Sequence, residues 1–295
     1  MTRQTQGELA LIGVTLVWGA TFVIVKNALD QVSTLLFLAM RFSLAALVLA
    51  LLFRGRLRAA RDLRGTTLAG GALAGGCLFF AYFFQTYGLR FTTPSKSAFI
   101  TGLTTALVPF LSALVYKRAP HLAEGVGVGI ATVGLAMLTL PPGRFTMSAG
   151  DALTLCCTVT FAFHILILGR WAPRSSFELL SVSQIGMTAL LALAVCGWAE
   201  PMYLEWSPRV GVAVLVTGLL ATALAFTVQA WAQRYTTPVR AALIFALEPV
   251  SAAITSYGVE GELLRGRALA GAAMIMAGVL LVELKPGAWR KHPFN

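Results

Sequence analysis

Residues 85–100 read QTYGLRFTTPSKSAFI, and residues 229–244 read QAWAQRYTTPVRAALI. The two segments lie 144 positions apart and share polar residues: a glutamine, an arginine, Thr-Thr-Pro, and a basic residue two positions after the proline. Apolar sequences often resemble one another by chance, but polar residues and proline at fixed spacing do not recur so easily. An offset of 143 also relates Gly7-Glu8 to Gly150-Asp151. The chain is therefore predicted to consist of two related halves, residues 1–145 and 146–295.

The sequence around these segments is too apolar for a soluble protein. Hydrophobic residues make up 57% of the 295 residues and charged residues 12%, and the mean hydropathy is +0.78. Soluble domains have about 25% charged residues. This composition excludes an ordinary soluble enzyme, a disordered chain and a secreted module framed by disulfides.

The apolar residues form runs of membrane-spanning length. A bilayer core of about 30 Å is crossed by about 20 helical residues, and the connections between the runs are short. Outer-membrane barrel segments, with alternating polar and apolar residues, are absent. We therefore predict an all-α integral membrane protein. Its ten transmembrane helices are expected at residues 8–26, 34–53, 67–88, 95–116, 122–140, 150–169, 177–199, 209–231, 239–258 and 265–283.

The parity of these helices predicts how the two halves are oriented. Each half contains five helices, and because five is odd, the second half enters the membrane from the opposite side. Inverted-topology repeats are common in secondary transporters, where alternating access operates around a site between the halves.

The basic residues predict the orientation of the whole chain. The net charge is +11, which in a soluble protein would suggest nucleic acid. Counted by side with alternating crossings, 15 basic residues fall on the side of the termini and 7 on the other. The positive-inside rule then places both termini in the cytoplasm. The charge therefore indicates orientation and contact with membrane lipid rather than nucleic acid.

Three ionisable residues fall at membrane depth, where such groups are functional candidates. Glu248 precedes Pro249 in the ninth run and is suited to bind a substrate ammonium or a proton; alternatively it bonds freed backbone donors or pairs with Arg41. Arg41 is expected to be structural or part of a gate. Pro109 is expected to be the comparable helix break in the first half.

The third ionisable residue, His164, lies in an apolar run of the sixth helix and has Thr21 as its repeat partner. A lone buried histidine is more often a satisfied core residue than a ligand, but a polar pair related by the inverted symmetry favours a place at a central cavity. The other residues predicted to line a substrate pathway are aromatic or adjacent to aromatic residues: Trp18, Phe22, Phe79, Tyr82, Gln85, Phe161 and Phe226. The alternative is that these rings pack in the core or face lipid.

Several motifs are missing from the sequence. It contains no GxxxxGK[ST] phosphate loop, no HExxH and no GxSxG. The four cysteines lack metal spacing. We therefore expect neither an enzyme nor a cofactor or metal. A GxxxG at Gly71 and Gly75 and another at Gly125 and Gly129 mark close helix packing, the second either within the chain or against a second copy; we expect a monomer or weak homodimer.

Taken together, these motifs resemble the drug/metabolite transporter superfamily, EamA branch. The resemblance rests on Trp18-Gly19-Ala20-Thr21-Phe22, on Arg41-Phe42, and on the two Thr-Thr-Pro segments with their downstream Pro109 and Glu248-Pro249. It implies an inverted-repeat transporter whose central cavity is lined mainly by the first, third, fourth, sixth, eighth and ninth helices. In size and layout the chain is similar to the aromatic amino-acid exporters of the YddG type.

The sequence analysis therefore predicts a secondary transporter that exports amino acids and related small metabolites, aromatic or apolar ones favoured, across a bacterial inner membrane. One alternative is a proton-coupled exporter of other drugs or metabolites. A second is a membrane-embedded enzyme with His164 and Glu248 as an acid/base pair, which requires the two side chains to lie within hydrogen-bond reach.

Overall fold

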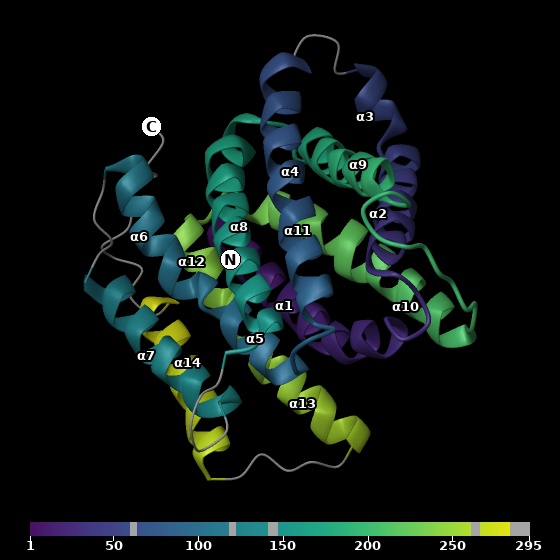
Figure 1. The fold of residues 1–295 in the computed structure, drawn as a ribbon. Coiled ribbons are helices and arrows are strands. Elements are labelled where there is room, and N and C mark those ends of the chain that lie inside the picture. The colour runs from purple at the N-terminus through teal and green to yellow at the C-terminus, as the bar shows by residue number, and fades with distance from the viewer. Residues whose placement is uncertain (60–63, 118–121, 141–146, 261–265, 284–295) are drawn as a thin grey trace.

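The structure is a computed structural model, described here for residues 1–59, 64–117, 122–140, 147–260 and 266–283. Within these ranges the chain consists of helices joined by turns and loops (Figure 1), and one isolated antiparallel bridge pairs Val32 with Leu204. The first half contains α1 (Arg3–Ala28), α2 (Thr34–Leu52), α3 (Arg54–Ala59), α4 (Arg64–Gly88), α5 (Pro94–Gly102), α6 (Thr104–Tyr116) and α7 (Leu122–Thr139).

The second half has a similar order of elements. It contains α8 (Ala149–Trp171), the short 3₁₀ turn η1 (Ala172–Arg174), α9 (Phe177–Val195), α10 (Pro208–Gly218), the π-helical segment η2 (Leu219–Leu224), α11 (Ala225–Ala232), α12 (Pro238–Phe245), α13 (Glu248–Glu260) and α14 (Arg267–Glu283). The bounds of α9 are those of α2 shifted by 143 positions.

Seven helical segments are long and apolar enough to cross a membrane. They are Arg3–Ala28, Thr34–Leu52, Gly65–Gly88, Lys96–Tyr116, Ala149–Arg174, Phe177–Val195 and Pro208–Ala232. Two shorter apolar helices, Leu122–Leu138 and Arg267–Val282, accompany them. Every one of the ten predicted runs coincides with helical structure, and ten membrane crossings remain a prediction.

Two of the predicted transmembrane helices are interrupted. Run 95–116 divides into α5 and α6 at Leu103, and run 239–258 divides into α12 and α13 at Ala246-Leu247. At both breaks the backbone tightens to bonds over three residues, from the Leu103 N–H to Ile100 (3.2 Å) and from the Ala246 N–H to Leu243 (3.1 Å). Leu103 and Leu247 are 144 positions apart, so the breaks follow the repeat.

The first-half break was expected at Pro109, and the structure corrects this. Pro109 lies inside the continuous helix α6, and the chain breaks six residues earlier. Gly102 weakens the helix there because glycine loses more backbone conformational entropy in a helix than other residues do. The hydroxyl of Thr104 also donates to the carbonyl of Thr101 (2.6 Å), which is a local bond that competes with the helix ladder. In the second half Pro249 is the second residue of α13, where its missing N–H is tolerated.

Small residues set the packing of α7 against α14 (Figure 1). A Cβ built on Gly134 would lie 2.6 Å from the carbonyl oxygen of Gly271, and one built on Gly278 would lie 2.6 Å from that of Gly127. Gly127 and Gly271 are repeat partners, as are Gly134 and Gly278. The two last helices of the halves therefore cross about a local two-fold axis.

Elsewhere α4 packs along both α8 and α9, and α2 packs on α9 and α10. The motif at Gly71 and Gly75 lies at the contact between α4 and α9, because a Cβ on either glycine would meet Ser183 or Gln184. The largest apolar cluster includes Phe37 and Phe42 of α2 together with Phe226 of α11. This packing surrounds a cavity in the middle of the helix bundle.

Candidate functional site

The cavity lies between helices of both halves. It is lined by side chains of α1, α2, α4, α5, α6, α8, α11, α12 and α13, together with Leu89 just after α4. These helices include all those that the family resemblance implies. The lining residues are Trp18, Thr21, Phe22, Val25, Arg41, Tyr82, Gln85, Thr86, Leu89, Thr101, Gly102, Thr104, Thr105, Phe161, His164, Ile165, Phe226, Gln229, Phe245 and Glu248.

Most of the lining consists of residues related by the repeat. Seven pairs in the lining have an offset of 143 or 144: Trp18 with Phe161, Thr21 with His164, Phe22 with Ile165, Tyr82 with Phe226, Gln85 with Gln229, Thr101 with Phe245, and Thr104 with Glu248. The cavity is therefore built twice from the same positions. The residue types differ within most pairs, so its two sides are chemically different.

Aromatic rings form a continuous part of the wall. The Trp18 ring lies 5.3 Å from Phe226 and 5.2 Å from Phe245 between centroids. Tyr82 meets Phe161 edge to face at 5.4 Å and Phe226 at 6.1 Å. The Trp18 Nε1–H donates to the carbonyl of Ala221 in η2 (2.8 Å), which fixes the indole. The faces of aromatic rings attract both apolar groups and cations.

Arg41 brings a buried positive charge to this wall. Its exposed fraction is 2%, and its Nε donates to the hydroxyl of Thr222 (2.7 Å). Its Nη2 donates to the Tyr82 hydroxyl (3.2 Å), and the guanidinium lies 4.4 Å from the centroid of the Tyr82 ring. Arg41 therefore links α2, α4 and η2. The expected alternative partner, Glu248, is not among its contacts in the described residues.

The π-helical turn η2 explains part of this geometry. Ala221 and Thr222 belong to it, and they receive the hydrogen bonds of Trp18 and Arg41. Single π-helical turns inside α-helices are frequent at functional sites because they redirect side chains and backbone groups. This segment breaks the regular ladder of the predicted helix 209–231, and no sequence signal in that run indicated it.

His164 is buried, with an exposed fraction of 1%. Its Nε2 shares a hydrogen bond of 2.9 Å with the side-chain oxygen of Gln184 in α9. Its ring meets Phe226 edge to face at 5.7 Å. On the first-half side, Gln85 donates to the hydroxyl of Thr101 (3.2 Å). These contacts orient polar side chains around the aromatic wall.

Glu248 differs from the other polar residues of the lining. It is the first residue of α13, directly after the break, and helix N-termini favour negative charge. Within the described part of the chain its carboxylate makes no hydrogen bond or ion pair. A carboxylate that faces a largely apolar cavity without a protein partner favours a bound cation or proton.

Of the ten residues predicted to line a substrate pathway, nine line the cavity. Phe79 does not line it; its ring packs against Phe80 (5.2 Å) and Phe83 (6.2 Å). Pro109 and Pro249 also lie outside the lining, while Arg41 is part of it.

The prediction missed several lining residues that the repeat could have supplied. Thr101 and Phe245 are partners of each other, and Gln229 is the partner of the predicted Gln85. Thr104 is the partner of Glu248. Applying the offset to each predicted residue would have found Gln229, Thr104 and Ile165, the partner of Phe22. Thr101 and Phe245 carry no such signal.

The arrangement offers no metal centre among the described residues, since no three His, Cys, Asp or Glu side chains there are grouped to hold an ion. His164 has Gln184 as its hydrogen-bond partner rather than Glu248, so the geometry required of an acid/base pair is not formed. What the geometry defines is a helical membrane protein with an aromatic, sparsely charged cavity between two related halves.

The chain belongs to the EamA-like transporter family, whose sequence model matches residues 5–140 and again residues 148–284. It is therefore a multi-pass membrane transporter with a small-molecule solute.

Individual relatives agree with this assignment. An "Uncharacterized transporter" of Archaeoglobus fulgidus is 32% identical over 96% of this chain and 87% of its own length. "Uncharacterized transporter YyaM" of Bacillus subtilis is 26% identical over 92% of each chain. A "Probable amino-acid metabolite efflux pump" of Salmonella typhimurium is 26% identical over 95% of each chain. A crystal structure of another protein shares the fold with a TM-score of 0.78 at 19% identity, over 95% of this chain and 97% of that one.

Proposed function

We propose that this transporter exports amino acids and related small metabolites across the bacterial inner membrane by alternating access, with aromatic or apolar amino acids favoured. The observation that carries the proposal is the unpartnered carboxylate of Glu248 in an aromatic cavity wall. The printed name of the Salmonella typhimurium relative agrees with this class of solute.

The architecture that we propose is ten transmembrane helices in two inverted five-helix halves, residues 1–145 and 146–295, with both termini in the cytoplasm. Three observations support it: the repeat offset, the equivalent breaks at Leu103 and Leu247, and the bias of 15 to 7 in basic residues. A cavity lined by repeat partners fits a site between two halves that exchange conformations.

The cavity suits a zwitterion with an apolar side chain. The ammonium of an amino acid would pair with Glu248 and contact the faces of Trp18 and Phe226. Arg41 is the basic residue of the lining, and its positive charge would face the substrate carboxylate. A sugar phosphate or nucleotide sugar would require more cations than this lining supplies.

The first testable prediction concerns Glu248. In proteoliposomes, we expect uptake or efflux of labelled aromatic amino acids above that of empty vesicles, and competition by unlabelled aromatic and apolar amino acids. Glu248→Gln keeps the size of the side chain and removes its charge, so we expect at least a tenfold lower rate of flux, in line with the loss of about 1.5–3 kcal/mol for a charged hydrogen bond.

The matched control is Glu205→Gln, because Glu205 is exposed in the loop before α10; we expect it to transport like the unmodified protein. Absence of amino-acid flux from folded protein would refute the proposal. Equal flux in Glu248→Gln would show that the carboxylate does not contact the substrate.

The unpartnered carboxylate also favours a second candidate, a proton-coupled exporter of other drugs or metabolites. The same vesicles distinguish the two mechanisms. Flux that follows an imposed pH gradient, and loses this dependence in Glu248→Gln, would indicate proton coupling. Flux that ignores the gradient would indicate facilitated movement down the solute gradient.

A further inference from the structure

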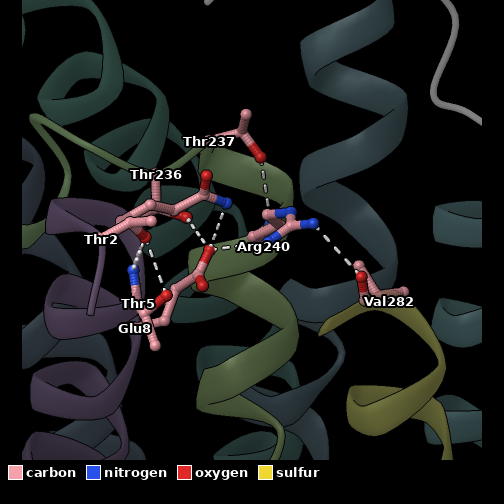
Figure 2. Close-up of polar contacts among 8 residues, drawn as sticks. Thr2, Thr5, Glu8, Thr236, Thr237, Arg240 and Val282 are labelled. Atoms are coloured by element: carbon pink, nitrogen blue, oxygen red, sulfur yellow. Dashed lines mark hydrogen bonds and ion pairs between the residues drawn. The ribbon is translucent and has the colours of Figure 1, made fainter. Parts of the chain in front are cut away.

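The repeated Thr-Thr-Pro motif lies outside the cavity lining, and its second copy builds a buried polar cluster (Figure 2). Glu8 of α1 lies at the start of α12, where Arg240 Nη1 donates to Glu8 Oε1 at 2.8 Å. The Thr236 hydroxyl donates to the same oxygen at 3.0 Å. Arg240 Nη2 donates to the carbonyl of Val282 in α14 (3.2 Å). We call Glu8, Thr236 and Arg240 the Glu8 latch.

The first copy of the motif builds an equivalent cluster. Lys96 Nζ lies 3.4 Å from Asp151 Oδ2, and the Thr92 hydroxyl donates to Asp151 Oδ1. Asp151 also accepts from the Ser148 N–H (2.8 Å) as part of the capping box of α8. We call Thr92, Lys96 and Asp151 the Asp151 latch.

The two latches are related residue by residue. Thr92 and Thr236 are 144 positions apart, as are Lys96 and Arg240, and Glu8 and Asp151 are 143 apart. The second threonine of each motif has the same role in both copies, because Thr93 and Thr237 cap α5 and α12 by accepting from the N–H of Lys96 and Arg240, each at 3.3 Å.

Each latch joins one half of the chain to the other. Glu8 lies in residues 1–145 and its partners in 146–295, whereas Asp151 lies in residues 146–295 and its partners in 1–145. They lie at opposite ends of α1. Lys26, near the end of that helix, donates to the carbonyl of Thr92 at 3.5 Å, and it is 18 residues or about 27 Å from Glu8 along the helix.

The two latches differ in the length and exposure of their ion pairs, although the Asp151 carboxylate is fully buried and accepts a shorter bond from Thr92 than Glu8 accepts from Thr236. Arg240 and Glu8 have side-chain exposed fractions of 3% and 9%, and their contact is 0.6 Å shorter than the contact of Lys96 with Asp151 (2.8 against 3.4 Å). Lys96 retains a side-chain exposed fraction of 21%.

The cavity is extended toward the Asp151 latch. Val25, Thr86 and Leu89 line it at the Asp151 end, but their repeat partners Leu168, Ala230 and Gln233 are not among its lining residues.

We propose that the Thr-Thr-Pro motifs form two gates that open in turn, the Glu8 latch sealing one end of the cavity while the Asp151 latch releases the other. The inference rests on the alternating access of the proposed function. Each opening separates a carboxylate from its cation at one membrane face, where water enters and solvates both charges. Each face has a threonine, a carboxylate and a cation at equivalent positions, as an inverted repeat requires of two gates that exchange roles.

A reversible covalent lock tests the Glu8 end. A Cβ built on Gly7 would lie 3.5 Å from the Cβ of Ala232, within the range of about 3.5–4.5 Å for a disulfide, and the pair bridges α1 and α11 beside the latch. We expect oxidised Gly7→Cys/Ala232→Cys, in a background with Cys77, Cys156, Cys157 and Cys196 replaced by alanine, to lose at least nine-tenths of its flux and to recover it on reduction. The matched controls are the two single variants under the same oxidant. Full flux with a complete disulfide would overturn the proposal, because it would show that this end never opens.

Thiol labelling tests both latches without a substrate. Ile165→Cys reports on the cavity toward the Glu8 end and Thr86→Cys toward the Asp151 end, each treated with a membrane-impermeant reagent from its own side. We expect Glu8→Gln to speed labelling of Ile165→Cys and slow that of Thr86→Cys, and Asp151→Asn to do the reverse. Glu178→Gln, which removes the ion pair of a half-buried carboxylate with the exposed Arg56 at 3.7 Å, is the matched control and should change neither rate.

The direction in which the labelling rates change distinguishes a gate from a structural contact. A variant that merely loosens the bundle speeds labelling at both positions, so changes in the same direction for Glu8→Gln and Asp151→Asn would overturn the proposal. No change in either variant would do so as well. Opposite changes in a protein that carries no amino acid would support the gates while refuting the proposed solute, so the two failures are distinguishable.

Discussion

Arg41 holds its charge in the cavity wall through three contacts that a lysine cannot reproduce together. Its planar guanidinium bonds Thr222 and the Tyr82 hydroxyl while lying over the Tyr82 ring. Lysine has a compact ammonium without this fork. We expect Arg41→Lys to lower the free energy of unfolding by about 1–3 kcal/mol, measured as a lower Tm in detergent.

The matched comparison for this residue is Tyr82→Phe, which keeps the ring below the guanidinium and removes one hydroxyl. Tyr82→Phe should lower the free energy of unfolding by about 1 kcal/mol, which is less than the effect of Arg41→Lys. An unchanged Tm for Arg41→Lys would mean that the ring and Thr222 contribute nothing to holding the charge.

At the residue scale, the sequence could predict cavity-facing positions of two kinds: those related by the repeat, and those that carry an ionisable group in an apolar run. His164, Glu248 and Arg41 stand out because ionisable groups in apolar runs are rare. Phe79 is three residues before Tyr82 on the same helix face, but the lining begins one turn later, at Tyr82. How far a cavity reaches along a helix depends on packing between distant segments, and periodicity within one segment does not contain that information.

At the element scale, the positions of the helix breaks also could not be predicted from local sequence alone. Pro249 lies in the first turn of α13, directly after the break at Ala246-Leu247, whereas Pro109 lies inside α6, because Gly102 and the Thr104 hydroxyl stop the first-half helix earlier. The symmetric break at Leu103 follows from its partner Leu247 once that break is known. Local composition alone favours the wrong proline.

The glycine motifs also show that local sequence does not reveal which helix face packs against a neighbour. The GxxxG of Gly125 and Gly129 predicted tight packing of α7 within the chain or against a second copy; within the chain, a Cβ on either residue would meet nothing within 4 Å. The packed glycines are Gly127 and Gly134, seven residues apart on the face toward α14. A GxxxG motif identifies small residues, and which helix face meets a neighbour is decided by the rest of the bundle.

This difference gives a paired prediction for α7. Gly134→Ala would place a Cβ 2.6 Å from the backbone oxygen of Gly271, so we expect it to separate the helices and destabilise the protein by about 1–3 kcal/mol. Gly129→Ala meets open space and gains helix propensity, so it should be neutral or stabilising by up to about 1 kcal/mol. Thermal unfolding of the two variants checks the opposite signs. Equal Tm values would show that α7 and α14 do not pack as described.

At the scale of the whole molecule, the two halves could be predicted from sequence because polar positions repeat at offsets of 143 and 144. The contacts that join them could not, because Glu8 and Arg240 are 232 residues apart and no local pattern pairs them. The repeat nevertheless indicated that these residues are equivalent: the Thr-Thr-Pro segments are 144 positions apart, and Glu8 and Asp151 are 143 apart.

The Glu8 latch also bears on how many times the chain crosses the membrane. Arg240 contacts both Glu8, near the start of α1, and the carbonyl of Val282, near the end of α14 (Figure 2). The start of α1 and the end of α14 therefore lie at the same end of the molecule, and this supports the prediction of an even number of crossings. The bridge between Val32 and Leu204 lies beyond the far end of α1, so the loop that precedes α10 belongs to the opposite end.

We therefore predict that reporters fused at either terminus lie on the same side of the membrane, and that a tag inserted beside Met202 lies on the other. The bias of 15 to 7 in basic residues predicts that the terminal side is the cytoplasmic one. Impermeant labelling of intact cells should reach the internal tag and neither terminus until the membrane is permeabilised. Labelling of one terminus but not the other would refute an even number of crossings. Labelling of both termini with protection of the internal tag would keep the architecture and reverse its orientation.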